Sequence, residues 1–171
     1  MNNDMQMQIE LEKKFLIEYP DLNELEKYSP KKYEIEQIYL LSETGSRRIR
    51  ARREGGSCIY IETVKIRING SKCYEYEREI SKEEYESFKA DADPKCAPII
   101  KDRYVFPYKD KIMELDVYPF WSDKAILEIE LENENDPYFI PDEIKVIKDV
   151  SDDKKYKNAA LARALKCNKL D

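Results

Sequence analysis

Charged and apolar residues alternate with a period of two in eight segments of this chain, and this pattern constrains the fold most strongly. Near the start, Glu10, Glu12 and Lys14 have one parity, while Ile9 and Leu11 have the other. Successive side chains of a strand point to opposite faces of a sheet. The pattern therefore predicts strands with one charged and one apolar face. The expected strands are residues 8–16, 36–42, 47–53, 57–68, 73–80, 99–108, 111–118 and 125–132.

Turn residues separate several of these strands, and the intervals between strands are short. Asn69-Gly70 is the strongest hairpin signal in the chain, because asparagine and glycine tolerate the positive φ angles of a tight turn. Most intervals are too short for the crossover helix that a parallel pair of strands needs. The sheet is therefore expected to be largely antiparallel.

Helical patterns are confined to three short segments. The second segment begins with Ser81 and has Glu84 three positions later, which is a capping-box pattern. No tandem repeat, low-complexity segment or linker interrupts the chain. A single domain over residues 1–171 is therefore expected. The expected helices are residues 20–28, 81–92 and 157–166.

The composition argues against several classes of function. The chain has 171 residues and a formal net charge of -6, and an acidic balance argues against nucleic acid as a partner. It contains no histidine, which removes histidine general bases, serine–histidine–aspartate triads and most zinc sites. Its four cysteines are scattered, without the paired spacing of a zinc ribbon or a redox motif.

The sequence also carries information about location. Residues 1–4 lack the basic region and apolar run of a signal peptide. No apolar stretch approaches the roughly 20 residues that a membrane helix needs. We therefore expect a cytoplasmic protein with reduced thiols and no membrane partner.

The charges on the strands are sorted by strand rather than mixed. The charged residues at alternate positions can form the solvated face of an open antiparallel sheet. They can also line the interior of a closed barrel, which with about eight strands can hold one small ligand. Like charges two positions apart gain nothing from each other, which favours a shared ligand or opposite charges across the sheet. The residues of this parity are Glu10, Glu12, Lys14, Arg48, Arg50, Arg52, Thr63, Lys65, Arg67, Glu75, Glu77, Glu79, Lys101, Arg103, Glu114, Asp116, Glu128, Glu130 and Glu132.

This set of side chains suits phosphate and a hard metal ion. Arginine makes forked contacts to phosphate, and lysine acts as a point charge. Carboxylates alone would repel phosphate, so the acidic residues call for a divalent cation such as Mg²⁺ or Mn²⁺. A neighbouring Arg103 would lower the pKa of Lys101, which could then accept a proton from water. Spacing alone favours the simpler alternative that both residues only bind phosphate.

The order of the motifs resembles the CYTH domain, also called the triphosphate tunnel metalloenzyme family. Its hallmark Glu-x-Glu-x-Lys corresponds to residues 10–14, and the later motifs follow in order to the C-terminal segment at residues 155–162. The resemblance implies an α+β, mainly β fold: an eight-stranded closed antiparallel barrel forming a tunnel, with a few helices packed outside. The later motifs are Arg48–Arg50, Thr63–Lys65, Glu75–Glu77, Lys101–Tyr104, Glu114–Asp116 and Glu128–Glu130.

The resemblance also implies roles for individual residues. Lys101 would activate water, with Arg103 beside it. The two arginines that match the family's motif on this strand would be either Arg48 and Arg50 or Arg50 and Arg52. Contact of Arg67, Glu79 and Glu132 with ligand is left open. The metal-binding acids would be Glu10, Glu12, Glu128 and Glu130; the phosphate-binding bases would be Lys14, Arg48, Arg50, Arg52, Lys65 and Arg103; further tunnel-facing residues would be Glu75, Glu77, Glu114 and Asp116.

Several activities are known in this family, so the resemblance leaves alternatives open. A stand-alone domain without a nucleic-acid-reading element best fits an inorganic tripolyphosphatase that uses Mg²⁺ or Mn²⁺. The alternatives are a nucleotide or thiamine triphosphatase, an adenylate cyclase, and a non-catalytic polyphosphate-binding module. The expected partner is a small-molecule triphosphate or polyphosphate, and the protein is expected to be a monomer or homodimer.

Overall fold

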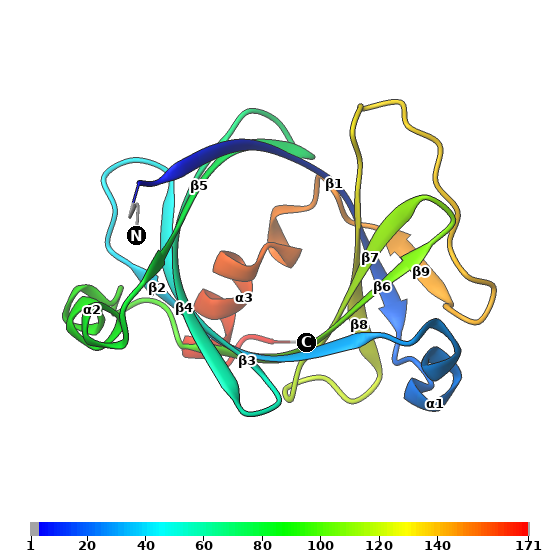
Figure 1. Cartoon of the computed structure of the whole chain (residues 1–171), viewed down its shortest axis with the longest axis horizontal. Coiled ribbons are helices and arrows are strands. Elements are labelled where there is room, and N and C mark those ends of the chain that lie inside the picture. The colour runs from blue at the N-terminus through cyan, green and yellow to red at the C-terminus, as the bar shows by residue number, and fades with distance from the viewer. Residues whose placement is uncertain (1–3, 171) are drawn as a thin grey trace.

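The computed structural model describes residues 4–170 and contains one closed antiparallel β-barrel (Figure 1). Residues 1–3, which belong to the N-terminal segment considered above, lie outside the described residues. The strand order is β5-β4-β3-β2-β6-β7-β8-β1, and a pairing of β5 with β1 closes the ring. The strands are β1 (Gln6–Glu18), β2 (Lys31–Leu40), β3 (Ser46–Glu54), β4 (Ser57–Arg67), β5 (Lys72–Ile80), β6 (Ile99–Tyr108), β7 (Lys111–Val117) and β8 (Lys124–Glu130).

All eight expected strands are present, and the expected barrel is confirmed. β2 begins earlier than expected, at Lys31, because its first residues pair with the far end of β6. A ninth strand, β9 (Val146–Asp149), was not expected. It has four exposed residues and pairs with β1 beyond the point where β5 ends. A short exposed strand without alternation leaves no periodic signal in the sequence.

The charged parity faces the interior of the barrel. Lys14, Thr63 and Glu128 are buried although they are polar. In the register, Glu12 lies opposite Glu130 and Lys14 opposite Glu128. The interpretation of an open sheet with a solvated charged face is therefore wrong. Lys14 and Glu128 are opposite charges on neighbouring strands, whereas Glu12 and Glu130 are two carboxylates that lie opposite each other.

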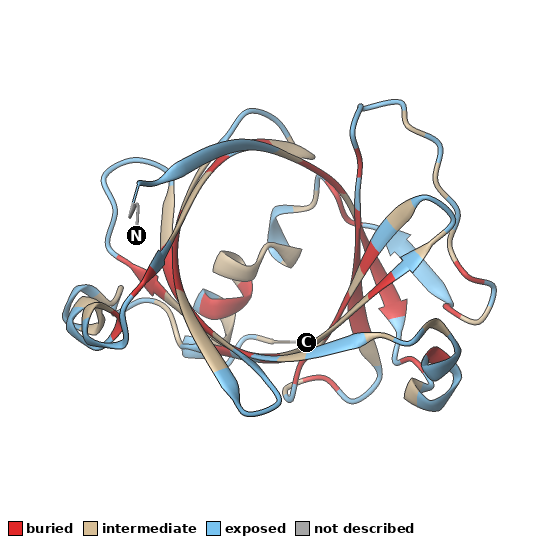
Figure 2. Cartoon of the chain, in the orientation of Figure 1, coloured by how far each residue is buried: buried red, intermediate tan, exposed pale blue. Residues whose placement is uncertain are grey.

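Apolar residues of the other parity form the outer core of the barrel. Leu115, Leu127 and Ile129 belong to a cluster that Phe15 and Phe106 extend over the outside of β1 and β6. Figure 2 shows the buried residues concentrated on the barrel strands, whereas β9 and most connecting loops are exposed. The barrel is thus stabilised mainly from outside, which leaves its interior free for polar side chains.

The helices are shorter than expected. The segment at residues 20–28 divides into α1 (Leu22–Leu25) and the 3₁₀ turn η1 (Glu26–Tyr28). The second is α2 (Lys82–Phe88), whose Ser81–Glu84 capping box is confirmed; it is followed by η2 (Lys89–Asp91). The third is α3 (Asn158–Lys166), preceded by η3 (Lys154–Tyr156). No helix in the described part of the chain is long and apolar enough to cross a membrane.

Helix α3 lies across one end of the barrel rather than along its outside (Figure 1). Leu161 and Ala162 of α3 pack with Leu16, Tyr39 and Ile126. Leu16 and Ile126 have the same parity as Lys14 and Glu128 on their strands, and Tyr39 lies opposite the inward-facing Arg48 of β3. The interior is therefore polar in the middle and apolar at the end that α3 covers.

Candidate active site

The interior of the barrel holds a cavity of about 380 Å³, which we call the tunnel cavity. Almost every residue that the sequence analysis assigned to a metal or phosphate site lines it. Arg67 lines it as well, whereas Glu79 and Glu132 do not. The basic and acidic lining residues among those assigned are Lys14, Arg48, Arg50, Lys65, Lys101, Arg103, Glu10, Glu12, Glu75, Glu77, Glu114, Glu128 and Glu130.

Two of the assigned residues lie outside this lining. Arg52 lines a neighbouring cavity of about 950 Å³, and its guanidinium lies 4.8 Å from the centre of the Tyr33 ring. The two arginines of β3 that do line the tunnel cavity are Arg48 and Arg50. Asp116 is completely buried behind the lining, where it pairs with Lys101. Alternation correctly indicates that Arg52 faces inward, but it does not give the depth of a side chain along the barrel.

Glu12 and Glu128 form the acidic centre of the site. Burial, followed by the charge of Glu128, raises the pKa of Glu12 to about 8. Burial acts to raise the pKa of Glu128 too, but Lys14 and Arg103 outweigh it and hold that pKa well below its usual range. Lys14 Nζ lies 3.0 Å from Glu128 and 3.8 Å from Glu12. The two carboxylates therefore share one proton at neutral pH, with Lys14 balancing one negative charge.

Glu10 belongs to a second ion-pair group on β1, β4 and β5. Lys65 Nζ lies 2.5 Å from Glu10 and 3.0 Å from Glu75. Burial acts to raise the pKa of Glu10, but Lys65 and Arg48 outweigh it and lower that pKa to about 2. The thiol of Cys73 donates to the same Glu10 oxygen at 3.2 Å. Glu10 is thus a fixed anion held between two strands.

Arg48 and Arg50 carry the clearest indication of an anionic ligand. Among the described residues, each has a buried Nε with no hydrogen-bond partner. Burial and the neighbouring Arg48 lower the pKa of Arg50 to about 10, which means that its charge is poorly compensated. Glu77 is the only ion-pair partner of Arg50 in the described part of the chain, at 3.3 Å. Buried donors without acceptors are costly, so these two side chains favour a bound anion.

Lys101, Arg103 and Asp116 form a buried triad on β6 and β7. Asp116 accepts from Lys101 Nζ at 2.7 Å and from Arg103 Nε and Nη2 at 2.6 and 2.7 Å. Burial, followed by the charge of Arg103, lowers the pKa of Lys101 to about 8 although Asp116 opposes this. Arg103 also pairs with Glu114 and lies 3.5 Å from Glu128. The geometry therefore gives Lys101 the lowered pKa that the sequence analysis predicted.

Some lining residues were missed in the sequence. Lys157 precedes α3, and its Nζ donates to the carbonyl oxygens of Gly70 at 3.0 Å and Ser151 at 2.8 Å. Burial and the charge of Lys14 lower its pKa to about 8. Tyr39, Asn158 and Gln8 also line the cavity. Lys157 lies in the lysine-rich segment that resembles the family's C-terminal segment. It lies outside the strands, so alternation could not predict which way its side chain faces.

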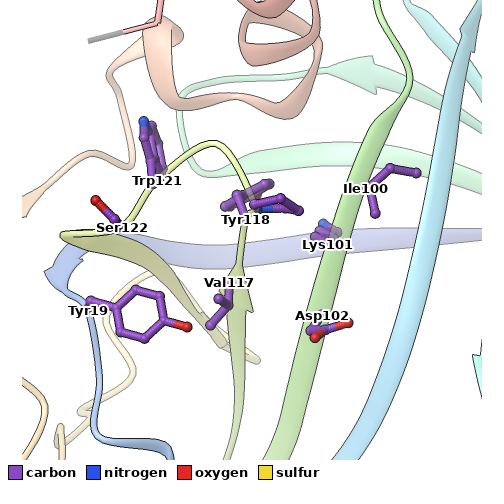
Figure 3. A pocket seen from close by; sticks show the side chains of 9 residues that line it. Tyr19, Ile100, Lys101, Asp102, Val117, Tyr118, Trp121 and Ser122 are labelled. Atoms are coloured by element: carbon purple, nitrogen blue, oxygen red, sulfur yellow. The ribbon is translucent and has the colours of Figure 1, made fainter.

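A cavity of about 400 Å³ on the outside of the barrel is similar in size to the tunnel cavity but differs in chemistry. Figure 3 shows Tyr19 and Val117 on one side of it and Ile100 and Asp102 of β6 on the other. Its lining is mainly apolar and aromatic, and Lys101 is its single basic residue. A triphosphate needs many cationic groups, so the tunnel cavity is the candidate site.

The acidic residues of the tunnel cavity suit a hard cation by their donor chemistry. Glu10, Glu12, Glu128 and Glu130 supply carboxylate oxygens from the adjacent strands β1 and β8. In residues 4–170, no group of three or more acidic or cysteine side chains is already gathered closely enough to hold a metal ion. Burial, and after it the negative charge of Glu128, raises the pKa of Glu12, and a cation bound beside Glu12 would favour its ionised form. The residues present therefore fit such an ion.

Comparison with known proteins identifies the family. The model of the CYTH domain matches residues 8–156. The chain belongs to the CYTH family. Members of this family generally depend on a metal ion. A search of curated proteins found no match.

Several solved structures have the same fold as this chain. The inorganic triphosphatase NE1496 is 28% identical to this chain, with a TM-score of 0.55, and the match covers 90% of this chain and 94% of that one. The PH1819 protein from Pyrococcus horikoshii OT3 is 21% identical, with a TM-score of 0.55 and coverage of 74% and 80%. A protein from Pyrococcus furiosus is 23% identical, with a TM-score of 0.54 and the same coverage. The two archaeal structures bear on the fold alone.

Proposed function

We propose that this CYTH protein is a metal-dependent triphosphatase and that its substrate is inorganic tripolyphosphate, which it hydrolyses to pyrophosphate and phosphate. The observation that carries the proposal is the pair of buried, unpartnered guanidinium nitrogens of Arg48 and Arg50 in a cavity lined by further bases. The similarity to NE1496, an inorganic triphosphatase, over 90% of the chain supports the choice of substrate.

The phosphate-binding residues are Lys14, Arg48, Arg50, Lys65 and Arg103. They come from β1, β3, β4 and β6 and therefore surround the cavity from several sides. An arriving triphosphate would give Arg48 and Arg50 the acceptors that they lack, and it would compete with Glu10 for Lys65. Binding and orienting the anion in this way accounts for much of the catalysis of phosphoryl transfer, which depends on positioning and charge stabilisation.

The metal site of the proposal consists of Glu10, Glu12, Glu128 and Glu130, and the metal is Mg²⁺ or Mn²⁺. When bound, such a cation supplies neutralisation of phosphate charge and activation of water. Glu12 and Glu128 would give up their shared proton, while Lys14 would become available to phosphate.

Lys101 is the proposed proton acceptor for the attacking water. Its side chain is 1% exposed and is fixed by Asp116, so it is held in one position. With a pKa of about 8, it is neutral in a useful fraction of molecules near pH 8. The charge of Arg103 helps to lower the pKa of Lys101. Arg103 itself stays charged and can bind the transferred phosphoryl group.

The remaining elements of the proposal concern organisation and location. We propose one domain over residues 1–171, a monomer or homodimer, and a small-molecule partner rather than nucleic acid or membrane. A cytoplasmic location agrees with the free thiols of Cys58, Cys73, Cys96 and Cys167.

The test is phosphate release from tripolyphosphate, ATP and pyrophosphate in parallel, each with Mg²⁺, Mn²⁺ and EDTA. We expect release from tripolyphosphate that needs a metal, with little release from ATP. Arg50→Met should abolish it, whereas Arg53→Met, a matched exposed arginine on the same strand, should not. Preferential ATP turnover would indicate a nucleotide triphosphatase or cyclase, and binding without release would indicate a polyphosphate-binding module.

A further inference from the structure

Tyr39 and Asn158 line the tunnel cavity without carrying a charge, and the proposed function assigns neither of them a role. Tyr39 lies on β2, opposite Arg48 of β3, and it packs in the same apolar cluster as Leu161 of α3. Asn158 is the first residue of α3. Both side chains therefore lie at the end of the cavity nearest α3, beside one of the two arginines that lack acceptors.

The hydroxyl group of Tyr39 has a proton that is free for a ligand. Gln37 Nε2 donates to the Tyr39 hydroxyl oxygen at 2.8 Å. A tyrosine hydroxyl that accepts a hydrogen bond can still donate one, and no hydrogen bond within residues 4–170 uses the Tyr39 proton. Tyr39 is 6% exposed, so its unused donor is a buried polar group that favours an acceptor in the cavity.

Gln37 has no other evident purpose than to hold Tyr39. It is completely buried in the interior of the barrel, and its Oε1 has no hydrogen-bond partner among the described residues. A buried amide with an unsatisfied oxygen is costly for folding and calls for an explanation. Its hydrogen bond to Tyr39 supplies one, because it fixes the direction in which the Tyr39 proton points.

Asn158 presents a second neutral donor in a similar way. The Tyr118 hydroxyl donates to Asn158 Oδ1 at 2.7 Å, and Tyr118 is itself fixed in the apolar cluster. This bond occupies the oxygen of the Asn158 amide and leaves the NH₂ group for the cavity. The Tyr118 ring also lies 5.9 Å from Lys101 Nζ (Figure 3). One buried side chain therefore positions Asn158 beside the proposed proton acceptor.

Neutral donors suit this end of the cavity because cations already lie close together there. Burial and the charge of Arg48 act to lower the pKa of Lys65, although neighbouring carboxylates outweigh them and raise it. A further cation would add to this repulsion, whereas a hydroxyl or amide group adds a hydrogen bond without a charge. Such hydrogen bonds are stronger where apolar side chains exclude water.

We infer that Tyr39 and Asn158 donate hydrogen bonds to the phosphoryl group of the triphosphate that lies nearest α3. The acceptors are the non-bridging oxygens of that group. Gln37 is a positioning residue that acts on the substrate through Tyr39, and Tyr118 acts through Asn158 in the same way. This inference rests on the proposed function, since it adds two donors to the same site.

The experiment measures tripolyphosphate binding by calorimetry in EDTA, and turnover with Mg²⁺ or Mn²⁺. Tyr39→Phe removes only a hydroxyl group, and Asn158→Asp keeps the oxygen that accepts from Tyr118 but removes the donor. We expect each change to weaken Kd by at least about tenfold, as the loss of a hydrogen bond to a charged acceptor requires. The kcat/KM should fall by at least as much.

Two exposed residues provide matched controls. Tyr74→Phe removes a hydroxyl group from the outside of β5, and Asn23→Asp adds the same charge as Asn158→Asp, but on α1. Neither residue lines any of the four described cavities. Both controls should bind tripolyphosphate with the Kd of the wild type.

A double-mutant cycle tests the positioning role of Gln37. Gln37→Met keeps the approximate size of the side chain but cannot hold the Tyr39 hydroxyl, so Kd should weaken by about threefold. The same change should leave Kd unaltered in the Tyr39→Phe background, because Gln37 acts only through that hydroxyl. An equal loss in both backgrounds would show that Gln37 does not act through Tyr39.

The outcomes separate these donors from the proposed function. Binding of tripolyphosphate without hydrolysis would overturn the proposed function, while the Kd values of the variants would still test the donors. Wild-type Kd values in Tyr39→Phe and Asn158→Asp would overturn the inference and leave the proposed function standing. If thermal unfolding shows that Tyr39→Phe is not folded, Asn158→Asp decides. If tripolyphosphate does not bind to the wild type, both conclusions are wrong.

Discussion

Replacing Asp116 by asparagine should destabilise the barrel strongly, because Asp116 is the carboxylate that pairs with both buried cations of the triad, Lys101 and Arg103. Asp116 is 0% exposed and accepts from Lys101 and Arg103. Burial alone would raise its pKa, but Arg103 and Lys101 outweigh burial and lower it. The carboxylate is therefore ionised at neutral pH, and Asp116→Asn removes a full charge from the interior.

The magnitude can be worked from the two partners. Without the Asp116 carboxylate, Lys101 can lose its proton and become neutral. From a pKa of about 8, the loss of this proton costs about 1.4 kcal/mol at pH 7. Arg103 cannot lose its proton, and a hydrogen bond to a charged group contributes about 1.5–3 kcal/mol. Its contacts with Glu114 and Glu128 remain. The sum is about 3–4 kcal/mol, in the range for breaking a buried ion pair.

Urea unfolding followed by circular dichroism measures this loss at pH 7 and pH 9. At pH 9, Lys101 is already neutral in the folded wild type, so the loss should be smaller by about 1.4 kcal/mol. In a thermal scan, Asp116→Asn should lower Tm by about 10 °C. The control is Asp102→Asn on the outward side of β6, where Asp102 makes a half-exposed ion pair with Lys32 at 3.4 Å. Its loss should stay below about 1 kcal/mol.

The reasoning is refuted if Asp116→Asn costs less than about 1 kcal/mol at pH 7. A loss of equal size at both pH values would refute the part that depends on Lys101. The first result would mean that Asp116 is not the charge that balances the triad, and the second that Lys101 does not lose its proton between pH 7 and pH 9.

Three further changes test other parts of the site. Glu10→Gln should abolish metal-dependent turnover while circular dichroism shows an intact fold; retained activity would remove Glu10 from the metal site. Lys101→Ala should lower kcat by about 100-fold, and the wild-type kcat/KM should rise with pH up to about 8 as Lys101 loses its proton; near-normal turnover of the variant would show that it is not the base. Gly45→Ala should cost about 2 kcal/mol in urea unfolding, because φ is +66° and a Cβ would lie 2.2 Å from the Lys65 carbonyl oxygen. Gly55→Ala, at φ +55° with nothing within 4 Å, should cost less.

The sequence predicted the strands of the barrel well because alternation is the physical signature of a sheet with two unlike faces. The charged parity placed Glu12, Lys14 and Glu128 in the interior, and the structure confirms this placement. The lowered pKa of Lys101 was also predicted, since Arg103 is its neighbour on the same face. The strand period gives the residues that share a face, and the sign of each charge gives the direction of the pKa shift, whereas the placement of that face inside a closed barrel was implied by the resemblance to the CYTH domain.

The sequence did not predict how deep each side chain lies along the barrel axis. Parity could not decide between Arg48 and Arg52 as the partner of Arg50, because all three arginines face inward and only the stagger of the strands sets their depth. It could not show that Asp116 lies behind the lining. Lys157 reaches the cavity from the segment before α3, and no period describes a chain that crosses the end of a barrel.

We expect β1, the first strand in the chain, to join the barrel last, because both of its partners in the ring, β5 and β8, come much later in the chain. β1 pairs along one edge with β8, where Glu12 lies opposite Glu130, and these two residues are far apart in the chain. Ring closure must therefore wait for a long loop, and such non-local pairing is slow. Since the proposed metal carboxylates Glu10 and Glu128 stand on the two sides of this seam, we expect the site to be assembled in the final step of folding. A cation held by carboxylates of both strands would then slow the separation of β1 from β8. Its effect on the unfolding rate would measure the stability of this pair of strands.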